Sequence, residues 1–334
     1  MQIANGPVQT YQVYPADALR VITGANLGDG IGVMEDLDLD DIYALSPMVT
    51  RRSLSLQSCT DNSFIIAQDS AIGTPLNTLH LDSILSFMSP DGHTMDVLVL
   101  VEVDGEGLIV QLFLLPMAPL HQKLEYTLLG KDRETARLKF AQLATVSFTR
   151  GTRITLSTGA QKAIEELCVG DRVLTRDEGV QPIRWIGQTT VRATGEMAPI
   201  LIRKGALNNS EDLIVSPDHR LFVYQRNDRI GAGNAELLVK ARHLVNGDSV
   251  VVQDGGFIDY FQLLFDRHHI IYAEGIAAET LLLDGATKPA VPDELLRKLA
   301  GKRHGEREDH GLEVKGTLLD RPDAIDLLRR ASTR

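Results

Sequence analysis

Short apolar runs separated by glycines and polar turns follow one another through the first part of the chain. Between Val13 and about Leu115 they include SLSLQ, SFIIAQ, MDVLVLVEVDG and EGLIVQLFLLP. Brief runs of this kind, bounded by turn residues, are typical of β-strands. The last two are joined by Asp104–Gly105, a dipeptide that favours a tight hairpin. The pattern predicts a β-rich N-terminal domain of unknown function over residues 1–145.

The pattern changes after residues 130–144, GKDRETARLKFAQLA, which predict a helix or a long connection between two domains. From Ser147 onward, brief strand-like runs alternate with glycine turns, as in TRITLSTG, PILIRKGAL and DLIVSPDHRLFVY. Regular short strands with turn signals between them indicate a second all-β domain. We expect this domain to span residues 146–285.

The last part of the chain, residues 286–334, has helical spacing. DELLRKLAG follows Pro292 and DAIDLLRRA follows Pro322, and proline is favoured in the first turn of a helix. The connecting stretch GKRHGEREDHG is charged. We expect a charged helical tail that either docks on the body or binds a partner. The chain as a whole is predicted to be mainly β.

Length and composition fit a folded protein of about two domains. The chain has 334 residues, of which 43% are hydrophobic and 24% charged, and a domain holds roughly 150 residues on average. The formal net charge is -11, which opposes binding to nucleic-acid phosphates or an anionic membrane. We therefore expect neither nucleic acid nor a membrane as the main partner.

Cysteine content and the N-terminal sequence bear on the compartment. The two cysteines, Cys59 and Cys168, lie far apart in the sequence, which predicts buried, reduced thiols and no disulfide framework. The first residues, MQIANGPVQTYQVYP, lack the basic and apolar regions of a signal peptide. No run approaches the roughly eighteen apolar residues of a membrane helix. The expectation is a cytoplasmic protein, with secretion without a signal left open.

Two stretches raise the question of a bound metal ion. Residues 28–41, GDGIGVMEDLDLDD, contain glycines followed by aspartates at alternating positions. The aspartate series is not followed by the loop glycine and the distal glutamate of a calcium-binding hand. A solvated turn accounts for them better. The two histidines of FDRHH are candidate zinc ligands, and His243 is the only other nearby candidate by sequence. A zinc site needs three or four converging ligands. We predict no metal and no cofactor.

Four stretches of the second domain form a specific pattern when they are taken together. In order they are SFTRGTRITLSTG, LCVGDRVLTRD, SPDHRLFV and LLFDRHHIIYAEG. By this order and spacing, residues 146 to about 285 resemble the Hint family, the self-processing module of hedgehog C-terminal domains and inteins, and specifically its bacterial hedgehog/intein-like type. The resemblance implies a Hint-type all-β fold with turns at Gly151, Gly159, Gly170 and Gly275.

The resemblance also implies a reaction at the Val146–Ser147 peptide bond. In this family the first residue of the domain, usually cysteine, attacks the carbonyl of the residue before it, and Ser147 matches that position. An N–O acyl shift would join the Val146 carbonyl to the serine hydroxyl as an ester. The alcohol is a weaker nucleophile than a thiol, which is partly ionised at neutral pH. The substrate would be the chain's own N-terminal segment.

The stretch SPDH supplies residues of the matching types. His219 matches the family histidine that donates a proton to the amide nitrogen of Ser147 when this nitrogen leaves. Ser216 matches the hydroxyl residue that positions the scissile peptide. The resemblance therefore assigns proton donation to His219 and positioning to Ser216.

A third group is expected near the end of the domain, where the family often keeps a polar residue that tunes the first step. In FDRHH the choices are Asp266, His268 and His269. Adjacent side chains on a strand point to opposite faces, so only one of the two histidines can face the site. We expect Asp266 or one histidine to assist.

The end of the domain argues against protein splicing. Inteins finish with a His-Asn pair whose asparagine cyclises, and here Glu279 and Thr280 stand at that place. By resemblance to hedgehog-type modules, the reaction would stop at the ester. Attack on this ester by water would release residues 1–146, and attack by an acceptor nucleophile would transfer them to the acceptor. Either reaction would be a single-turnover autoproteolysis.

Two other interpretations stay open. Ser147 also fits an ordinary hydroxyl at a strand start, and His219 fits a core histidine held by turn contacts. The Hint fold would then be an inert scaffold or interaction module that works as the intact chain. The third interpretation is a conventional hydrolase that acts on outside substrates.

Overall fold

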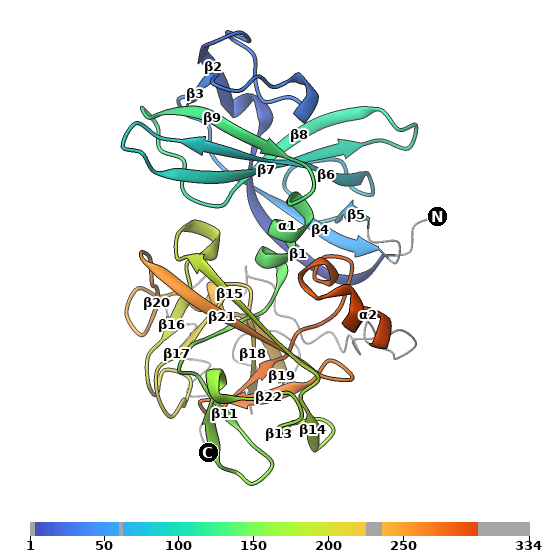
Figure 1. Cartoon of the computed structure of the whole chain (residues 1–334), viewed down its shortest axis with the longest axis vertical. Coiled ribbons are helices and arrows are strands. Elements are labelled where there is room, and N and C mark those ends of the chain that lie inside the picture. The colour runs from blue at the N-terminus through green and yellow to red at the C-terminus, as the bar shows by residue number, and fades with distance from the viewer. Residues whose placement is uncertain (1–3, 60–62, 225–235, 300–334) are drawn as a thin grey trace. The chain divides into compact units, whose positions relative to one another are not determined.

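The computed structural model describes residues 4–59, 63–224 and 236–299, and most of its elements are strands (Figure 1). The chain divides into two compact units. Among the described residues, unit 1 holds those up to 144 together with 284–290, and unit 2 holds those of 145–283 together with 291–299. The mainly β fold class predicted from the sequence is confirmed.

Unit 1 is built on an antiparallel sheet of nine described strands in the order β2-β3-β9-β6-β5-β4-β1-β8-β7. Strand β6 also pairs with β7, and this pairing closes a ring of six strands from which β9, β3 and β2 continue. Closing the ring pairs strands that would otherwise end the sheet. The strands are β1 (Ala4–Pro15), β2 (Leu19–Thr23), β3 (Ile42–Leu45), β4 (Arg52–Cys59), β5 (Phe64–Ile66), β6 (Thr78–Met88), β7 (Thr94–Val103), β8 (Ile109–Pro116) and β9 (Glu125–Asp132).

The predicted hairpin is present as β7 and β8, which pair along most of their length. Its turn is longer than a two-residue one. The Asp104 carboxylate accepts hydrogen bonds from the amides of Glu106 and Leu108, each at 2.9 Å. The left-handed backbone falls on Gly107, with φ +86°. Asp104 therefore starts the turn as predicted, whereas Gly107 rather than Gly105 supplies the required conformation.

Residues 130–144, which predicted a helix or a connection, contain helix α1 (Ala136–Ala144). The Phe140 ring anchors this helix within unit 1, because its centroid lies 5.1 Å from the Tyr11 ring and 5.1 Å from the Phe64 ring. Contacts at this separation are typical of packed aromatic pairs. The helix ends at Ala144, two residues before the predicted scissile bond.

In its described residues, unit 2 contains two six-stranded antiparallel sheets and one two-stranded pair. The first sheet has the order β15-β21-β10-β17-β16-β20, the second has the order β12-β11-β22-β23-β18-β19, and β13 pairs with β14. The strands are β10 (Phe148–Thr149), β11 (Arg153–Thr155), β12 (Gln161–Ala163), β13 (Arg172–Leu174), β14 (Val180–Pro182), β15 (Trp185–Arg192), β16 (Ile200–Ile202), β17 (Leu213–Val215), β18 (Arg220–Tyr224), β19 (Glu236–Lys240), β20 (Val250–Val252), β21 (Phe257–Leu264), β22 (Ile270–Ala273) and β23 (Ile276–Glu279).

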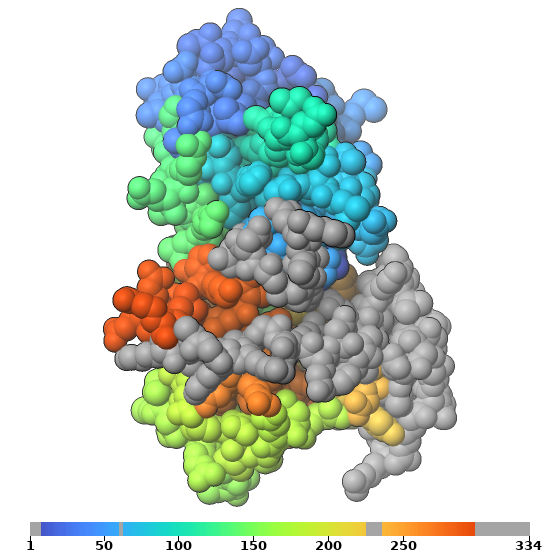
Figure 2. All heavy atoms as spheres, turned by 90° about the vertical axis from the view of Figure 1, so that its right-hand side faces the viewer, coloured from blue at the N-terminus to red at the C-terminus, as the bar shows by residue number. Residues whose placement is uncertain are grey.

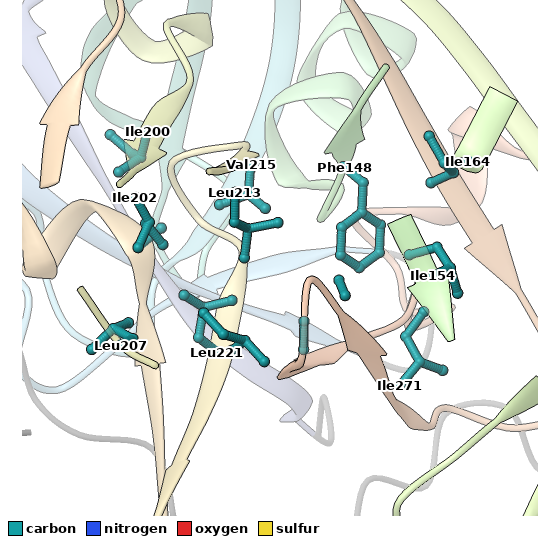
Figure 3. Close-up of a cluster of buried hydrophobic side chains, with 14 of the residues drawn as sticks. Phe148, Ile154, Ile164, Ile200, Ile202, Leu207, Leu213, Val215, Leu221 and Ile271 are labelled. Carbon is teal, nitrogen blue, oxygen red and sulfur yellow. The ribbon is translucent and has the colours of Figure 1, made fainter. Parts of the chain in front are cut away.

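A large apolar cluster lies between these strands. Its members come from both large sheets and include Phe148, Ile154, Val215, Leu221 and Ile271, all fully or almost fully buried (Figure 3). Burial of such side chains contributes about 1.5–3 kcal/mol each. Through Phe148, the cluster anchors β10, the strand that follows Ser147.

Turn glycines and cysteines partly follow the sequence expectations. The four glycines expected at turns all have left-handed backbone: Gly151, Gly159, Gly170 and Gly275. Neither cysteine forms a disulfide bond; Cys59 is buried as expected, but Cys168 is exposed. Its exposure follows from its place in the turn that closes with the hydrogen bond from the Asp171 amide to the Cys168 carbonyl, at 3.0 Å.

The predicted tail begins with helix α2 (Asp293–Leu299). Leu295 and Leu296 of this helix pack against a small apolar cluster of unit 2 that includes Leu283 and Val291. Its outer face is the red-orange surface in Figure 2. The second predicted helix, DAIDLLRRA, lies outside the described residues. Within the described ranges no helix is both long enough and apolar enough to span a membrane.

Short 3-10 helices complete the described elements. They are η1 (Ala16–Ala18), η2 (Met34–Asp36), η3 (Ile164–Glu166), η4 (Gly195–Met197), η5 (Ala241–Leu244) and η6 (Lys288–Ala290).

Candidate active site

Ser147 lies directly before β10, between two neighbouring strands whose register decides its surroundings. Phe148 is paired with Val215 of β17 on one side and with Phe261 of β21 on the other. In an antiparallel pair, the residue one position earlier on one strand lies opposite the residue one position later on its partner. Ser216 and Gln262 are therefore brought opposite Ser147.

All three polar groups of Ser147 have hydrogen-bond partners, and the residue is only 2% exposed. Its amide donates to the Ser216 hydroxyl oxygen at 3.0 Å. Its hydroxyl oxygen accepts from Nε2 of Gln262 at 2.7 Å. Its carbonyl oxygen accepts from the Ser216 amide at 2.9 Å and lies 3.0 Å from Nδ1 of His219. Residues from distant parts of the sequence thus fix the conformation of Ser147.

His219 reaches the site because Ser216 to His219 form a turn, with the His219 amide donating to the Ser216 carbonyl at 3.0 Å. The imidazole is completely buried, with its ring centroid 4.4 Å from that of Phe148. We expected it to face the amide nitrogen of Ser147. Its hydrogen-bond contact is instead with the carbonyl oxygen of that residue, while Ser216 accepts the amide proton.

The second ring nitrogen of His219 also faces a carbonyl, since Nε2 lies 3.1 Å from the main-chain oxygen of Glu279. Burial lowers the pKa of His219 below 6.5, against the opposing effects of the hydrogen bond to Ser147 and the Glu279 carboxylate. A neutral imidazole has one N–H and can donate to only one of these oxygens. Protonation would turn both contacts into hydrogen bonds.

The structure brings Ser147, Ser216 and His219 together, and it leaves Asp266 in a different set of contacts. The Asp266 carboxylate accepts from Nε of Arg184 at 2.9 Å in a partly exposed ion pair. The residue follows the end of β21, where the chain turns away from the strand that carries Gln262. The assisting role expected for Asp266 stays a prediction.

The two histidines of FDRHH point to different partners. Nε2 of His268 lies 3.2 Å from the Glu279 carboxylate, and Nδ1 of His269 lies 3.0 Å from the Asp177 carboxylate. Only His268 is linked to the contacts of His219, through Glu279. No group of three or more potential metal ligands occurs within the described ranges.

Sequence reasoning missed a buried ion pair behind His219. Nη1 of Arg220 lies 2.9 Å from the Glu279 carboxylate, and the two side chains are 4% and 1% exposed. The carboxylate of Glu279 thus pairs with Arg220, while the main-chain oxygen of Glu279 contacts the imidazole of His219. The available signal was the arginine next to the motif histidine, but its partner is about sixty residues away in the sequence.

Gln262 was also missed, although a lone amide within the apolar run YFQLLF is a visible signal. Gly187 of β15 pairs with Gln262 and leaves room for its side chain. A Cβ atom at Gly187 would lie 2.6 Å from Oε1 of Gln262 and 2.2 Å from the Trp185 ring. The lack of a side chain at Gly187 therefore leaves the space in which the Gln262 amide lies.

The contacts of the hydroxyl limit what the resting site can do. Oγ of Ser147 contacts the Gln262 amide and, at 3.5 Å, the Thr145 carbonyl oxygen. Neither group takes up a proton near neutral pH. The site therefore orients the alcohol firmly and offers its proton only weak acceptors among these contacts.

Comparisons with known proteins concern the part of the chain that contains this site. Residues 146–285 match the sequence model described as the Hint domain. Among solved structures, the gp41-1 intein is 14% identical, with a TM-score of 0.26, covering 40% of this chain and 97% of its own. The MchDnaB-1 intein is 10% identical, with a TM-score of 0.26, covering 40% and 98%. No curated protein matches. The match to the sequence model places residues 146–285 in the Hint domain family.

Proposed function

We propose that this chain cleaves itself at the Val146–Ser147 bond. Oγ of Ser147 attacks the carbonyl carbon of Val146 and loses its proton, and the bond from this carbon to the Ser147 nitrogen breaks. The nitrogen takes up a proton and becomes a free α-amino group. Val146 is then joined to Ser147 through an ester, which water or an acceptor nucleophile opens to release residues 1–146.

The observation that supports this proposal most is the way Ser147 is held. Its amide, hydroxyl and carbonyl each contact a different side chain, those of Ser216, Gln262 and His219. Orientation of a nucleophile against the bond that it attacks is a large part of catalysis. The family match over residues 146–285 favours self-processing chemistry in general.

Splicing is not part of the proposal. Glu279 and Thr280 are almost completely buried, and Thr280 Oγ1 accepts the His269 amide at 2.9 Å. Neither side chain can form the cyclic imide that asparagine forms in splicing. The reaction therefore ends with an N-terminal fragment and a Hint-domain fragment.

The test is an intact-mass measurement of freshly purified protein, with and without hydroxylamine, which opens esters much faster than amides. We expect the masses of a hydroxamate of residues 1–146 and of the fragment that begins at Ser147. Ser147→Ala should stay whole, and Ser157→Ala, at an exposed serine of the same domain, should behave as the parent. Only the full-length mass under both conditions would end the proposal.

One observation favours a second candidate, an inert Hint scaffold that works as the intact chain. The Gln262 amide donates to the Ser147 hydroxyl at 2.7 Å and occupies a lone pair of the nucleophile. A scaffold would stay whole in hydroxylamine and would also stay whole after Ser147→Cys. Self-cleavage in either protein excludes this candidate.

A further inference from the structure

Unit 1 contains a piece of chain that comes after the Hint domain strands. Residues 284–290, called here the return segment, cluster with residues up to 144, although the residues on both sides of them belong to unit 2. Unit 1 is therefore made from two separate parts of the chain. The predicted scissile bond at Val146–Ser147 lies between these two parts.

The return segment is a compact turn stabilised by its own hydrogen bonds. Oδ1 of Asp284 accepts from the amide of Ala286 at 2.9 Å and from the amide of Thr287 at 3.0 Å. The Asp284 amide donates in return to Oγ1 of Thr287 at 3.0 Å. This reciprocal pattern is that of a capped helix start and leads into η6. The segment therefore has a defined shape.

In unit 1, η6 contacts helix α1. The buried residues of α1 include Phe140, Ala141 and Ala144, and side chains next to each other in a helix point about 100° apart. Phe140 packs on the rings of Tyr11 and Phe64. Ala141 is nevertheless fully buried, so the helix is covered on a second side as well.

The return segment has buried side chains and is anchored at both ends. Ala286 and Thr287 are 3% and 4% exposed. Leu283 before the segment and Val291 after it are both buried in the apolar cluster of unit 2 that includes Leu264 and Leu281. The segment is thus a short loop of the Hint-domain fragment that is packed within unit 1.

We propose that the return segment keeps the N-terminal fragment bound after the chain is cut between Val146 and Ser147. The interaction surface is α1 with the return segment, and the partner is the chain's own residues 1–146. For the natural cut, this inference rests on the proposed self-cleavage. Cleavage then yields a two-chain protein rather than two free products.

The first test uses the full chain cut by hydroxylamine. Mass spectrometry in denaturant reports whether the bond is broken, and size-exclusion chromatography in native buffer reports whether the fragments stay together. We expect broken chains that elute as one species of the intact size. Fragments that are cut and elute separately would overturn the retention proposal, whereas an uncut chain would count against self-cleavage alone.

A second test does not need self-cleavage. A protease recognition sequence is inserted between Ala144 and Thr145 of the full-length Ser147→Ala chain, and the protein is cut with that protease. We again expect co-elution. Ala286→Arg, which places a charge at a buried position of the return segment, should abolish co-elution after the cut, and Pro289→Arg, at an exposed position of the same segment, should preserve it.

The uncut variants are compared with the parent by circular dichroism to show that they fold. If Ala286→Arg does not fold, the neutral Ala286→Gln takes its place, and we expect the cut fragments to separate faster than those of the parent. Co-elution of folded, cut Ala286→Arg or Ala286→Gln to the same extent as the parent would show that other contacts retain the fragment. That result would overturn the role of the return segment.

Discussion

Each polar group of Ser147 forms a hydrogen-bond contact with a residue that is distant from it in the sequence. Ser216 and His219 could be predicted because they belong to a motif with fixed spacing. Gln262 could not be predicted, because its contact depends on which strand lies beside β10, and strand order is a property of the whole sheet. Asp266 pairs with Arg184, and its assisting role stays a prediction.

Replacement of the nucleophile by a thiol should speed the reaction. A few per cent of a thiol is ionised at neutral pH, whereas an alcohol is not. We expect Ser147→Cys to lose its full-length mass about tenfold faster than the parent, or more, in hydroxylamine. Ser157→Cys, at an exposed position, is the matched control and should not change the rate. A Ser147→Cys chain that stays whole would favour the scaffold.

The contact between Gln262 and Ser147 should be visible in stability. Gln262→Leu leaves the buried Ser147 hydroxyl without its donor, which costs about 1–3 kcal/mol of unfolding free energy. The double variant Gln262→Leu with Ser147→Ala removes both partners, so its loss should be smaller than the sum of the single losses. Urea unfolding measures all three. Strictly additive losses would mean that the two side chains do not interact.

Burial of His219 predicts a pH dependence of stability. Because its folded pKa is lowered below 6.5, the unfolded chain binds more protons between the folded and unfolded pKa values. The unfolding free energy should therefore fall as the pH is lowered from about 8 to about 5.5. In the uncleavable Ser147→Ala background, His219→Gln should reduce this fall. Equal pH slopes in the two proteins would contradict the assignment to His219.

At the level of elements, strand patterns were readable but their pairing was not. The β7–β8 hairpin followed from two adjacent apolar runs, because neighbours in sequence pair locally. The pairing of β10 with both β17 and β21 joins residues more than sixty and more than one hundred positions apart. Such contacts depend on closure of long loops, which no local pattern records.

The contact of Gly187 with Trp185 and Gln262 makes this part of β15 sensitive to a single methyl group. In Gly187→Ala the new Cβ must displace the Trp185 ring or the Gln262 amide, which should cost about 1–3 kcal/mol. Trp185 is the only tryptophan of the chain, so its fluorescence emission should shift. Gly105→Ala, where a Cβ meets nothing within 4 Å, should show neither effect.

For the whole molecule, the sequence indicated a seam near residues 130–144 but not the return segment. The seam is a local change in pattern, and α1 lies within it. From the sequence, the return segment looks like a simple connection between the Hint domain and the tail. Nothing local in DGATKPA indicates a contact with a helix about 140 residues earlier. Only the folded chain shows that 284–290 complete unit 1.

Because each unit has its own buried core, damage to one should be separable from the other. Phe140→Ala removes a buried ring of unit 1 and should cost about 3–5 kcal/mol there. Calorimetry of the Ser147→Ala chain should show one transition lowered, while Trp185 fluorescence, which reports on unit 2, keeps its midpoint. Phe257→Ala, at a ring 79% exposed, should leave both transitions in place.

The discontinuous make-up of unit 1 also sets an order for folding during synthesis. Its final seven residues, 284–290, leave the ribosome about 140 residues after the first part ends at 144. At roughly 5–20 residues per second, this delay is on the order of ten seconds. The nascent N-terminal part must wait through that interval for its last piece, and by then every strand of the Hint domain has already been made.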